Sequence, residues 1–339
     1  MTYGVDDRMT DRWPPSCLII IPCLNEAAHI GALLGLLEPS ARRLNARIVV
    51  VDGGSTDGTQ EIVSRFAADS PAVLLLENKK RLQSAAVNLA VHLLGEGVEY
   101  FIRIDAHGGY PEDYCDWLLE EAVATGADSV VVSMETTGSG LVQSAAAAAQ
   151  NSKLGTGGSK HRHKAWGEWI DHGHHALMRI SAFTAVGGYD ESFSHNEDAE
   201  LDHRLRRAGY RIWLTAKTRM TYYPRSTFKG LYLQYLGYGR GRARNVLKHR
   251  VVPKVRQMAP LLILPFAILA TLSFVYWFAA VPFLLWAATC LVYGAMLAIR
   301  ERDAKLLLAG PSAMIMHFAW SAGFWLQLLS AGLRRREAA

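Results

Sequence analysis

An apolar stretch of 42 residues without a charged side chain, residues 258–299, constrains the fold of this 339-residue chain more than any other feature. As a helix it would extend about 60 Å at about 1.5 Å per residue. A membrane span needs about 20 such residues, so the stretch is long enough for two spans. Tyr276 and Trp277 suit a membrane interface and Pro282 suits a helix start. We therefore expect a helical hairpin that turns near these residues, because a buried hairpin of a soluble domain would be shorter.

A third apolar stretch, residues 306–333, is interrupted by Gly310 and Pro311. Three complete spans would place the basic residues 334–336 outside, against the tendency of Lys and Arg to stay in the cytoplasm. The sequence leaves open whether residues 306–333 span the membrane, re-enter it or lie on it.

Most of the formal charge of +5 lies beside these apolar stretches. The basic residues concerned are Arg240, Arg242, Arg244, Lys248, Arg250, Lys254, Arg256, Arg300, Arg302, Lys305 and residues 334–336. Their placement predicts cytoplasmic flanks against an anionic leaflet of the inner membrane. The first 15 residues lack the apolar core of a signal peptide, so we expect the soluble part to face the cytoplasm. Nucleic acid is not an expected partner, because no aromatic and basic binding module accompanies the charge.

The first half of the chain alternates apolar runs, typical of buried strands, with segments of helical spacing. The predicted strands are residues 17–21, 47–51, 72–76, 99–104 and 129–133, and the predicted helices are 26–38, 58–69, 82–95 and 111–125. This order predicts an α/β fold with a mostly parallel sheet and helices on both faces. Four cysteines share no metal-binding spacing, so we expect reduced thiols.

Polar side chains follow three of the predicted strands, at the edge where open α/β sheets bind ligands. Asn25 and Glu26 follow the first strand, Asp52 follows the second, and Asp105 and His107 follow the fourth. A carboxylate and an imidazole two positions apart can share one divalent cation, and such a cation can neutralise a diphosphate. We therefore expect these side chains to converge on one site.

Asp52 begins the turn VDGGSTDGT at residues 51–59. The turn lacks the lysine and the glycine spacing of a P-loop. Asp52 either accepts hydrogen bonds from a bound nucleoside or caps its own turn, and the sequence leaves both open.

Residues 196–209, NEDAELDHRLRRAG, carry acids in the first turn and arginines in the last, which predicts a helix. Asp198 falls on the same face as the apolar residues Leu201 and Leu205, whereas Glu197 points elsewhere. A carboxylate directed inward at a helix start is either a cap or a base beside a substrate.

The histidine-rich run DHGHH, residues 171–175, could bind a metal by composition. Its pattern is that of alternating strand residues, which would put His172 and His174 on one face and Gly173 and His175 on the other. We therefore expect His172, Gly173 and His174 to contact substrate and do not expect a metal cluster.

The segment YGRGRARN, residues 238–245, places an arginine at every second position. It is either a membrane-facing charge run or a set of guanidinium groups of which one or two clamp a diphosphate.

Together, five motifs resemble those of the family 2 inverting glycosyltransferases with the GT-A fold. They are IPCLNE (21–26), VVDGGSTDGT (50–59), IDAH (104–107), GGYDESFSHNEDAEL (187–201) and YYPRS (222–226). The resemblance runs from about residue 15 to residue 250. It implies that the nucleotide pocket is lined by Pro22, Asn25, Glu26 and Asp52, with Asp52 on the uracil.

The resemblance also implies a catalytic machinery. Asp105 and His107 would occupy the place of the metal-binding DxD motif, and Asp198 would be the catalytic base, with Glu197 beside it contacting substrate. The diphosphate-contacting arginine would be Arg240, Arg242 or Arg244.

Two departures from the family pattern matter. His107 replaces the second Asp of DxD, which leaves Mn²⁺ or Mg²⁺ open, although an imidazole ligand favours Mn²⁺. The QxxRW signature of processive synthases is absent, which implies the transfer of one sugar per encounter.

The implied organisation is a tail at residues 1–15, a GT-A glycosyltransferase domain at 16–225, a basic amphipathic interface segment at 226–257, membrane-associated or transmembrane helices at 258–333 and a basic tail at 334–339. The implied activity is a β-linking transfer of glucose from UDP-glucose to a polyprenyl-diphosphate-linked saccharide of an exopolysaccharide, alongside other polysaccharide-assembly enzymes. Two alternatives stay open: a polyprenyl-phosphate glycosyltransferase that makes a lipid-phosphate sugar donor, and a non-catalytic membrane sensor of nucleotide sugars.

Overall fold

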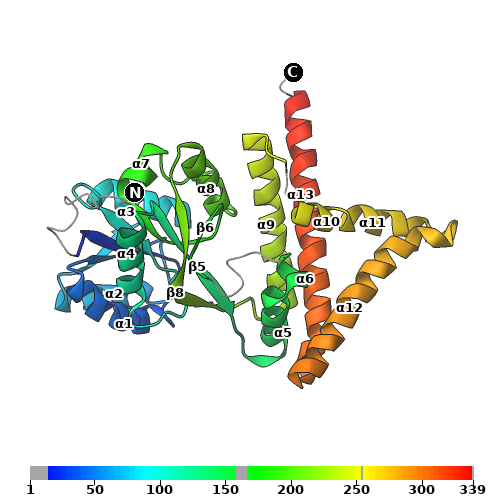
Figure 1. Cartoon of the computed structure of the whole chain (residues 1–339), viewed down its shortest axis with the longest axis horizontal. Helices are drawn as coiled ribbons and strands as arrows, with labels where there is room; N and C mark the ends of the chain where they lie inside the picture. The colour runs from blue at the N-terminus through cyan, green and yellow to red at the C-terminus, as the bar shows by residue number, and fades with distance from the viewer. Residues whose placement is uncertain (1–13, 158–165, 253–254, 338–339) are drawn as a thin grey trace, which may run out of the picture. The chain divides into compact units, whose positions relative to one another are not determined.

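A computed structural model describes residues 14–157, 166–252 and 255–337 (Figure 1). The chain forms two compact units that are each built from several segments. The first unit comprises Met1–Val132, Trp166–Glu191 and Leu201–Arg219, and the second comprises Ser133–Ala165, Ser192–Glu200 and Met220–Ala339. The predicted N-terminal tail lies outside the described residues except for its last two positions, and so do the side chains of the terminal basic residues.

An eight-stranded sheet forms the centre of the first unit, in the order β3-β2-β1-β4-β7-β5-β8-β6. The strands are β1 (Cys17–Cys23), β2 (Arg47–Asp52), β3 (Val73–Glu77), β4 (Tyr100–Arg103), β5 (Ser129–Thr136), β6 (Glu168–Ile170), β7 (His174–Arg179) and β8 (Ile212–Tyr222). The first four strands are parallel, and β7 runs antiparallel between β4 and β5. The predicted α/β fold is confirmed, and all five predicted strands are present. The carboxyl ends of β1, β2 and β4 meet at one edge of the sheet.

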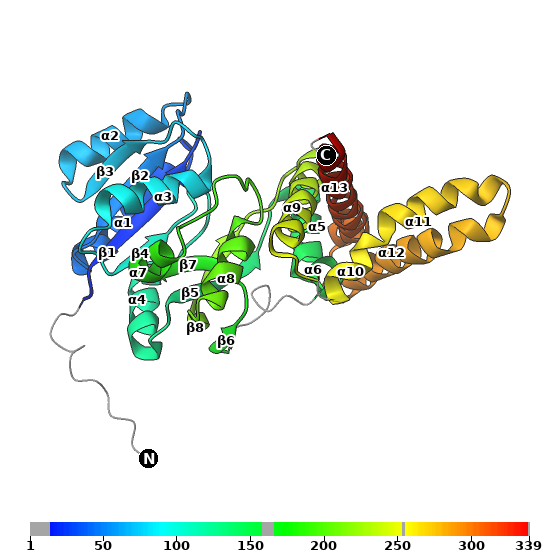
Figure 2. The same cartoon turned by 90° about the horizontal axis from the view of Figure 1, so that it is seen from above.

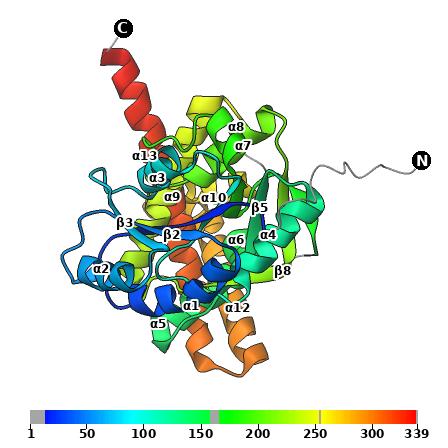
Figure 3. The ribbon, with the colours of Figure 1, turned by 90° about the vertical axis from the view of Figure 1, so that its left-hand side faces the viewer.

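Helices cover both faces of this sheet (Figure 3). They are α1 (Ile30–Arg43), α2 (Thr59–Asp69), α3 (Gln83–Leu94), α4 (Tyr114–Thr125), α7 (Ile180–Ala185) and α8 (Glu197–Arg207). The first helix starts four residues later than predicted. The reason is that Asn25 adopts a φ of +57° and its neighbours are hydrogen-bonded to the next loop.

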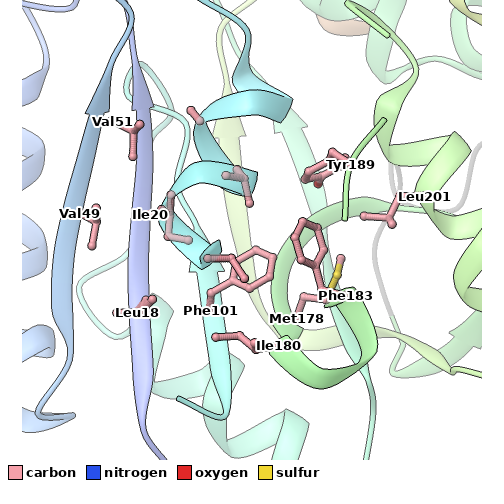
Figure 4. Close-up of a cluster of buried hydrophobic side chains, with 14 of the residues drawn as sticks. Leu18, Ile20, Val49, Val51, Phe101, Met178, Ile180, Phe183, Tyr189 and Leu201 are labelled. Atoms are coloured by element: carbon pink, nitrogen blue, oxygen red, sulfur yellow. The ribbon is translucent and has the colours of Figure 1, made fainter. Parts of the chain in front are cut away.

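A buried apolar cluster joins β1, β2 and β4 to α3, α7 and α8 (Figure 4). Phe101 and Phe183 meet edge to face with ring centroids 5.0 Å apart. Leu201 and Leu205 of α8 are fully buried, as the helical pattern predicts. Because burial of each large apolar side chain contributes about 1.5–3 kcal/mol, these contacts hold α8 firmly against the sheet.

The second unit is helical. Its helices are α5 (Gly140–Asn151), α6 (Lys153–Thr156), α9 (Phe228–His249), α10 (Val255–Leu261), α11 (Ile263–Ala270), η3 (Thr271–Phe274), η4 (Trp277–Ala280), α12 (Val281–Glu301), η5 (Ala304–Leu308) and α13 (Ala309–Glu337). Helices α9 and α13 lie side by side (Figures 1 and 2). A Cβ atom at Gly239 would overlap the carbonyl oxygen of Trp320, and one at Gly323 would overlap that of Leu236. Glycine at these two positions therefore allows the helix backbones to touch.

The apolar stretch forms the predicted hairpin, which turns at η3 and η4 between α11 and α12 (Figure 2). Of the two arms of the hairpin, Met258–Phe274 is the shorter apolar helical segment, and it is divided into α10, α11 and η3. The two helical segments of the described residues that are long and apolar enough to cross a membrane are Trp277–Glu301 and Ala304–Leu333.

Gly310 and Pro311 do not interrupt the third apolar stretch. They lie in the first turn of α13, where the missing backbone donor of proline is tolerated. Residues 306–333 therefore consist of the end of η5 and most of one long helix, α13, which is partly buried.

Candidate active site

Two loops at the carboxyl edge of the sheet are hydrogen-bonded to each other. The backbone N–H of Asn25 donates to Ser55 Oγ at 2.7 Å, and Asn25 Oδ1 accepts from the N–H of Thr56 at 2.9 Å. The N–H of Ala27 donates to the carboxylate of Asp57 at 3.0 Å. The loop that follows β1 is therefore held against the loop that follows β2, as expected for residues that share one edge of the sheet.

Asp52, at the end of β2, accepts four hydrogen bonds, three from its own turn and one from the start of α2. Its Oδ1 accepts from the N–H groups of Gly54 and Ser55 at 2.8 and 2.9 Å and from Gln60 Nε2 at 2.6 Å, and its Oδ2 accepts from Ser55 Oγ. Of the two roles left open for this carboxylate, the structure shows the capping one. A nucleobase bound here would replace one of these donors, of which the Gln60 side chain is the most easily moved.

Cys23 lies beside this edge as a buried free thiol. Burial and the nearby carboxylates of Glu26, Asp52 and Asp57 raise the pKa of its thiol to about 12. It therefore stays protonated at neutral pH and supplies no nucleophile. All four cysteines are free and buried.

Asp105 follows β4, and three nitrogen-bearing side chains lie near its carboxylate. Its Oδ1 accepts from Gln83 Nε2 at 2.9 Å, and its Oδ2 lies 3.5 Å from His174 Nε2. The Nε atom of Arg103 lies 3.8 Å from Asp105 Oδ1. Arg103 is buried, and one of its terminal nitrogens donates to the hydroxyl of Tyr189. About a fifth of the Asp105 side chain is exposed, so a ligand can reach it.

His107 is held by Glu26, a pairing that the sequence did not reveal. The distance from His107 Nδ1 to Glu26 Oε1 is 2.9 Å. Since a carboxylate only accepts, neutral His107 donates from Nδ1 and carries its lone pair on Nε2. Histidines that bind metals commonly donate their second N–H to a carboxylate in this way.

The donor set of these two residues, a carboxylate and an imidazole, suits a metal that would be shared with a substrate. Among the described residues, no group of three or more His, Cys, Asp and Glu side chains could hold an ion. Asp105 and His107 would thus supply part of a coordination sphere, and phosphate and water oxygens would complete it.

The histidine-rich run differs from its predicted arrangement. The strand β7 begins only at His174, so the expected alternation does not extend back to His172. His172 Nδ1 lies 2.6 Å from Asp202 Oδ2, and His175 Nε2 lies 2.7 Å from Asp202 Oδ1. The prediction that His172 and His175 belong to opposite faces is therefore wrong, since they share one carboxylate. A Cβ atom at Gly173, between them, would overlap the side chain of Val131.

Asp202 is a site residue that sequence reasoning missed. Its side chain is 1% exposed. Burial acts to raise the pKa of its carboxyl group, but His175 and His172 outweigh burial and hold that pKa below its ordinary value. The signal in the sequence that could have identified Asp202 was its position on the predicted helix, one helical turn after Asp198.

The first turn of α8 carries the candidate base. Glu197 and Asp198 are both half-buried there. Asn196 directly precedes the helix, with a φ of +66°, and its side-chain amide donates to the carbonyl of Tyr238 on α9 at 3.0 Å. The start of the helix is therefore anchored.

Glu200, on the same helix, is completely buried and was also missed. Lys248 Nζ lies 2.6 Å and His249 Nε2 lies 3.0 Å from its Oε1. These two partners belong to the end of α9, so they add a second anchor between α8 and α9.

A cavity of about 280 Å³ lies in the second unit. Its walls include Phe193, His195, Leu236, Arg240, Arg244 and Gln327. Arg240 and Arg244 are one turn apart on α9 and share its face toward the cavity, whereas Arg242 is not part of its wall. The guanidinium of Arg244 also donates to the carbonyl of Ser192 and lies over the Phe193 ring.

His195, in the wall of the cavity, is neutral at neutral pH. The reason is that burial and the nearby charge of Arg225 lower the pKa of its imidazole.

Comparisons with known proteins identify relatives of the chain and structures of similar fold. Residues 18–187 match the family described as Glycosyl transferase family 2. The chain is 62% identical to the succinoglycan biosynthesis protein ExoA of Rhizobium meliloti, over 95% of this chain and 97% of that protein. It is 30% identical, over 37% of its length and 48% of the other protein, to a polyprenol monophosphomannose synthase of Mycolicibacterium smegmatis. Among solved structures it resembles the mannosyltransferase PcManGT of Pyrobaculum calidifontis, in complex with GDP-Man and Mn²⁺. That match has a TM-score of 0.61 and 20% identity, over 93% of this chain and 87% of the other.

Proposed function

Because the chain belongs to glycosyl transferase family 2 and has a GT-A fold, we propose that it transfers one glucose from UDP-glucose to a polyprenyl-diphosphate-linked saccharide. The product would be the β-linked intermediate of a succinoglycan-like exopolysaccharide. The observation that carries this proposal is the 62% identity to the succinoglycan biosynthesis protein, which extends over nearly the whole of both chains.

The donor site would lie at the carboxyl edge of the sheet. Pro22, Asn25, Glu26 and Asp52 would line the nucleotide pocket, and the hydrogen bonds between their loops support this placement. An arginine of α9, either Arg240 or Arg244, would contact the diphosphate.

A divalent cation would bind beside Asp105 and His107. When bound with the donor, it would neutralise the charge that develops on the departing diphosphate. Glu26 orients the His107 ring for this role through its 2.9 Å hydrogen bond.

The chemistry proposed for the chain itself is a proton transfer at Asp198. Its carboxylate would accept the proton of the acceptor hydroxyl while that oxygen attacks the anomeric carbon of the donor. A single in-line displacement inverts the configuration, which gives a β-linked product from an α-linked donor. Glu197, His172, Gly173 and His174 would contact the sugars.

The acceptor would remain attached to the inner membrane, with the catalytic domain in the cytoplasm. Residues 16–225 would form that domain and 226–257 the basic interface segment. The two long apolar helices support the membrane assignment. Other polysaccharide-assembly enzymes would supply the lipid-linked acceptor and consume the product.

The experiment that tests this function is transfer of radiolabelled sugar into a lipid extract from a panel of nucleotide sugars, with and without Mg²⁺ or Mn²⁺. We expect label from UDP-glucose in a lipid-linked saccharide, and only with a divalent ion. Release of UDP in the same assay separates an enzyme from a sensor of nucleotide sugars, which would bind the donor without turnover.

A polyprenyl-phosphate glycosyltransferase is the second candidate, favoured by the partial match to the polyprenol monophosphomannose synthase. Its acceptor would be a phosphate, which is already ionised and needs no strong base. Activity of Asp198→Asn on a bare lipid phosphate would favour this candidate.

A further inference from the structure

Two neighbouring histidines at the start of β7 contact carboxylates of two different elements. His174 Nε2 lies 3.5 Å from Asp105 Oδ2, after β4, and His175 Nε2 lies 2.7 Å from Asp202 Oδ1, on α8. Successive residues of a strand point to opposite sides, so one strand can hold both carboxylates. The start of β7 therefore connects the candidate metal ligand to the helix that carries the candidate base.

The histidine tautomers agree with these contacts. Arg103 can only donate, and one of its terminal nitrogens lies 3.5 Å from His174 Nδ1. Neutral His174 therefore has its proton on Nε2 and directs it at Asp105. In the same way, Asp202 as an ionised carboxylate requires a donor from each histidine that faces it.

Asp202 has little freedom to move. One of its oxygens pairs with His172 at 2.6 Å and the other with His175 at 2.7 Å, and both Asp202 and His175 are almost fully buried. A buried carboxylate that loses a partner is strongly destabilised, so a rotation or shift of α8 that broke either contact would be unfavourable.

Asp198 lies four residues before Asp202 on α8, which is about one turn away on the same face. Holding Asp202 therefore also sets the rotation of the helix at Asp198. A small displacement of a catalytic group can greatly reduce a reaction rate.

We propose that Asp202, held by His172 and His175, is a positioning residue that fixes the direction of Asp198, while His174 fixes Asp105 from the same strand. The inference rests on the proposed function, in which Asp198 is the base. It assigns the three histidines of the run, His172, His174 and His175, mainly to the alignment of the site.

The chain offers a matched control. Asp171 pairs with Arg206 at 3.1 Å, and this ion pair joins the same two segments as the pair of Asp202 and His172. Both side chains are about half exposed. Exposed ion pairs contribute little to stability, so this one should not position the helix.

The first test compares Asp202→Asn with Asp171→Asn in the full-length, detergent-solubilised enzyme. We expect Asp202→Asn to lower kcat by about 10- to 100-fold, the usual effect of losing a supporting hydrogen bond at an active site. UDP affinity and the KM for the donor should stay within about twofold, because the donor pocket is built from other loops. Asp171→Asn should keep kcat within about twofold of the wild type.

The second test uses isosteres at His175, which is buried and has no proposed contact with substrate. The amide nitrogen of a glutamine can occupy the place of His175 Nε2, whereas leucine fills the volume without a donor. We expect His175→Gln to retain most of kcat and His175→Leu to lose it to the same extent as Asp202→Asn. If Asp202→Asn does not fold, the comparison of His175→Gln with His175→Leu tests the inference by itself.

Equal kcat values for His175→Gln and His175→Leu, or a wild-type kcat for Asp202→Asn, would overturn the inference. A loss that appears only as a lower melting temperature, with kcat unchanged, would assign these residues to stability alone. Failure of the proposed function is recognised separately, because the wild-type enzyme would then show no transfer or Asp198→Asn would keep it.

Discussion

At the scale of single residues, ionisable side chains of the candidate site are paired between elements that are distant in sequence. His107 pairs with Glu26, and His172 and His175 pair with Asp202. Each pairing sets which nitrogen of the ring carries the proton. Partners from other elements thus fix the tautomers of these histidines.

Asp198→Asn is the most direct test of the base. The amide keeps the size of the side chain but does not accept a proton, so we expect turnover to fall by about 10²- to 10⁴-fold. The protein should fold and bind UDP as the wild type does, which calorimetry can measure. Turnover at the wild-type level would remove Asp198 from this role.

Substitutions at His107 test the metal site. We expect His107→Ala to raise the Mn²⁺ concentration needed for half-maximal activity by on the order of tenfold. His107→Asp, which provides a second carboxylate, should shift the preference from Mn²⁺ toward Mg²⁺. Metal titrations of the three proteins check this, and a wild-type enzyme that clearly prefers Mg²⁺ would argue against His107 as a direct ligand.

The candidate site was only partly predictable from the sequence. The polar residues after β1, β2 and β4 were recognisable because a parallel sheet brings the ends of its strands together. The partners of Asp202 and Glu200 could not be recognised from the sequence, because they depend on how α8 packs against β7 and α9. Periodicity also misplaced His172, because it assumed a strand that in fact begins two residues later.

At the scale of elements, strands were predicted best and the apolar helices least well. Strands of a parallel sheet are buried on both faces, so they are nearly continuous apolar runs that the sequence displays directly. The composition of the first apolar arm did not show that the arm is divided into α10, α11 and η3. Where a helix ends depends on backbone hydrogen bonds, which composition does not record.

The contact of α9 and α13 supplies a prediction at this scale. Gly239→Ala adds a Cβ atom against the backbone of α13, and overpacking of this kind costs about 1–3 kcal/mol. We expect a lower melting temperature of the detergent-solubilised protein. Gly332→Ala is the control, because it lies on α13 with open space around it, and alanine favours helix. An equal effect of the two substitutions would show that close packing at Gly239 is unimportant.

At the scale of the whole molecule, apolar side chains are exposed in one stretch of the second unit. Phe274 is 97% exposed and Trp277 is 78% exposed, and both lie at the turn of the hairpin. Most of α12 is exposed as well. So large an apolar surface is unfavourable in water and is typical of a segment that enters a membrane.

Cell fractionation tests this reading. We expect the full chain to sediment with membranes, to resist high salt and alkaline carbonate, and to be released by detergent. Release by salt alone would mean that the basic residues bind the surface electrostatically and that the apolar helices do not insert.

The glycine contact of α9 and α13 has a consequence for the depth of the diphosphate site. Because the two helix backbones touch at Gly239 and Gly323, Arg240 and Arg244 keep a fixed position along the long apolar helix α13. A diphosphate that binds to either arginine would therefore be held at one depth relative to that helix.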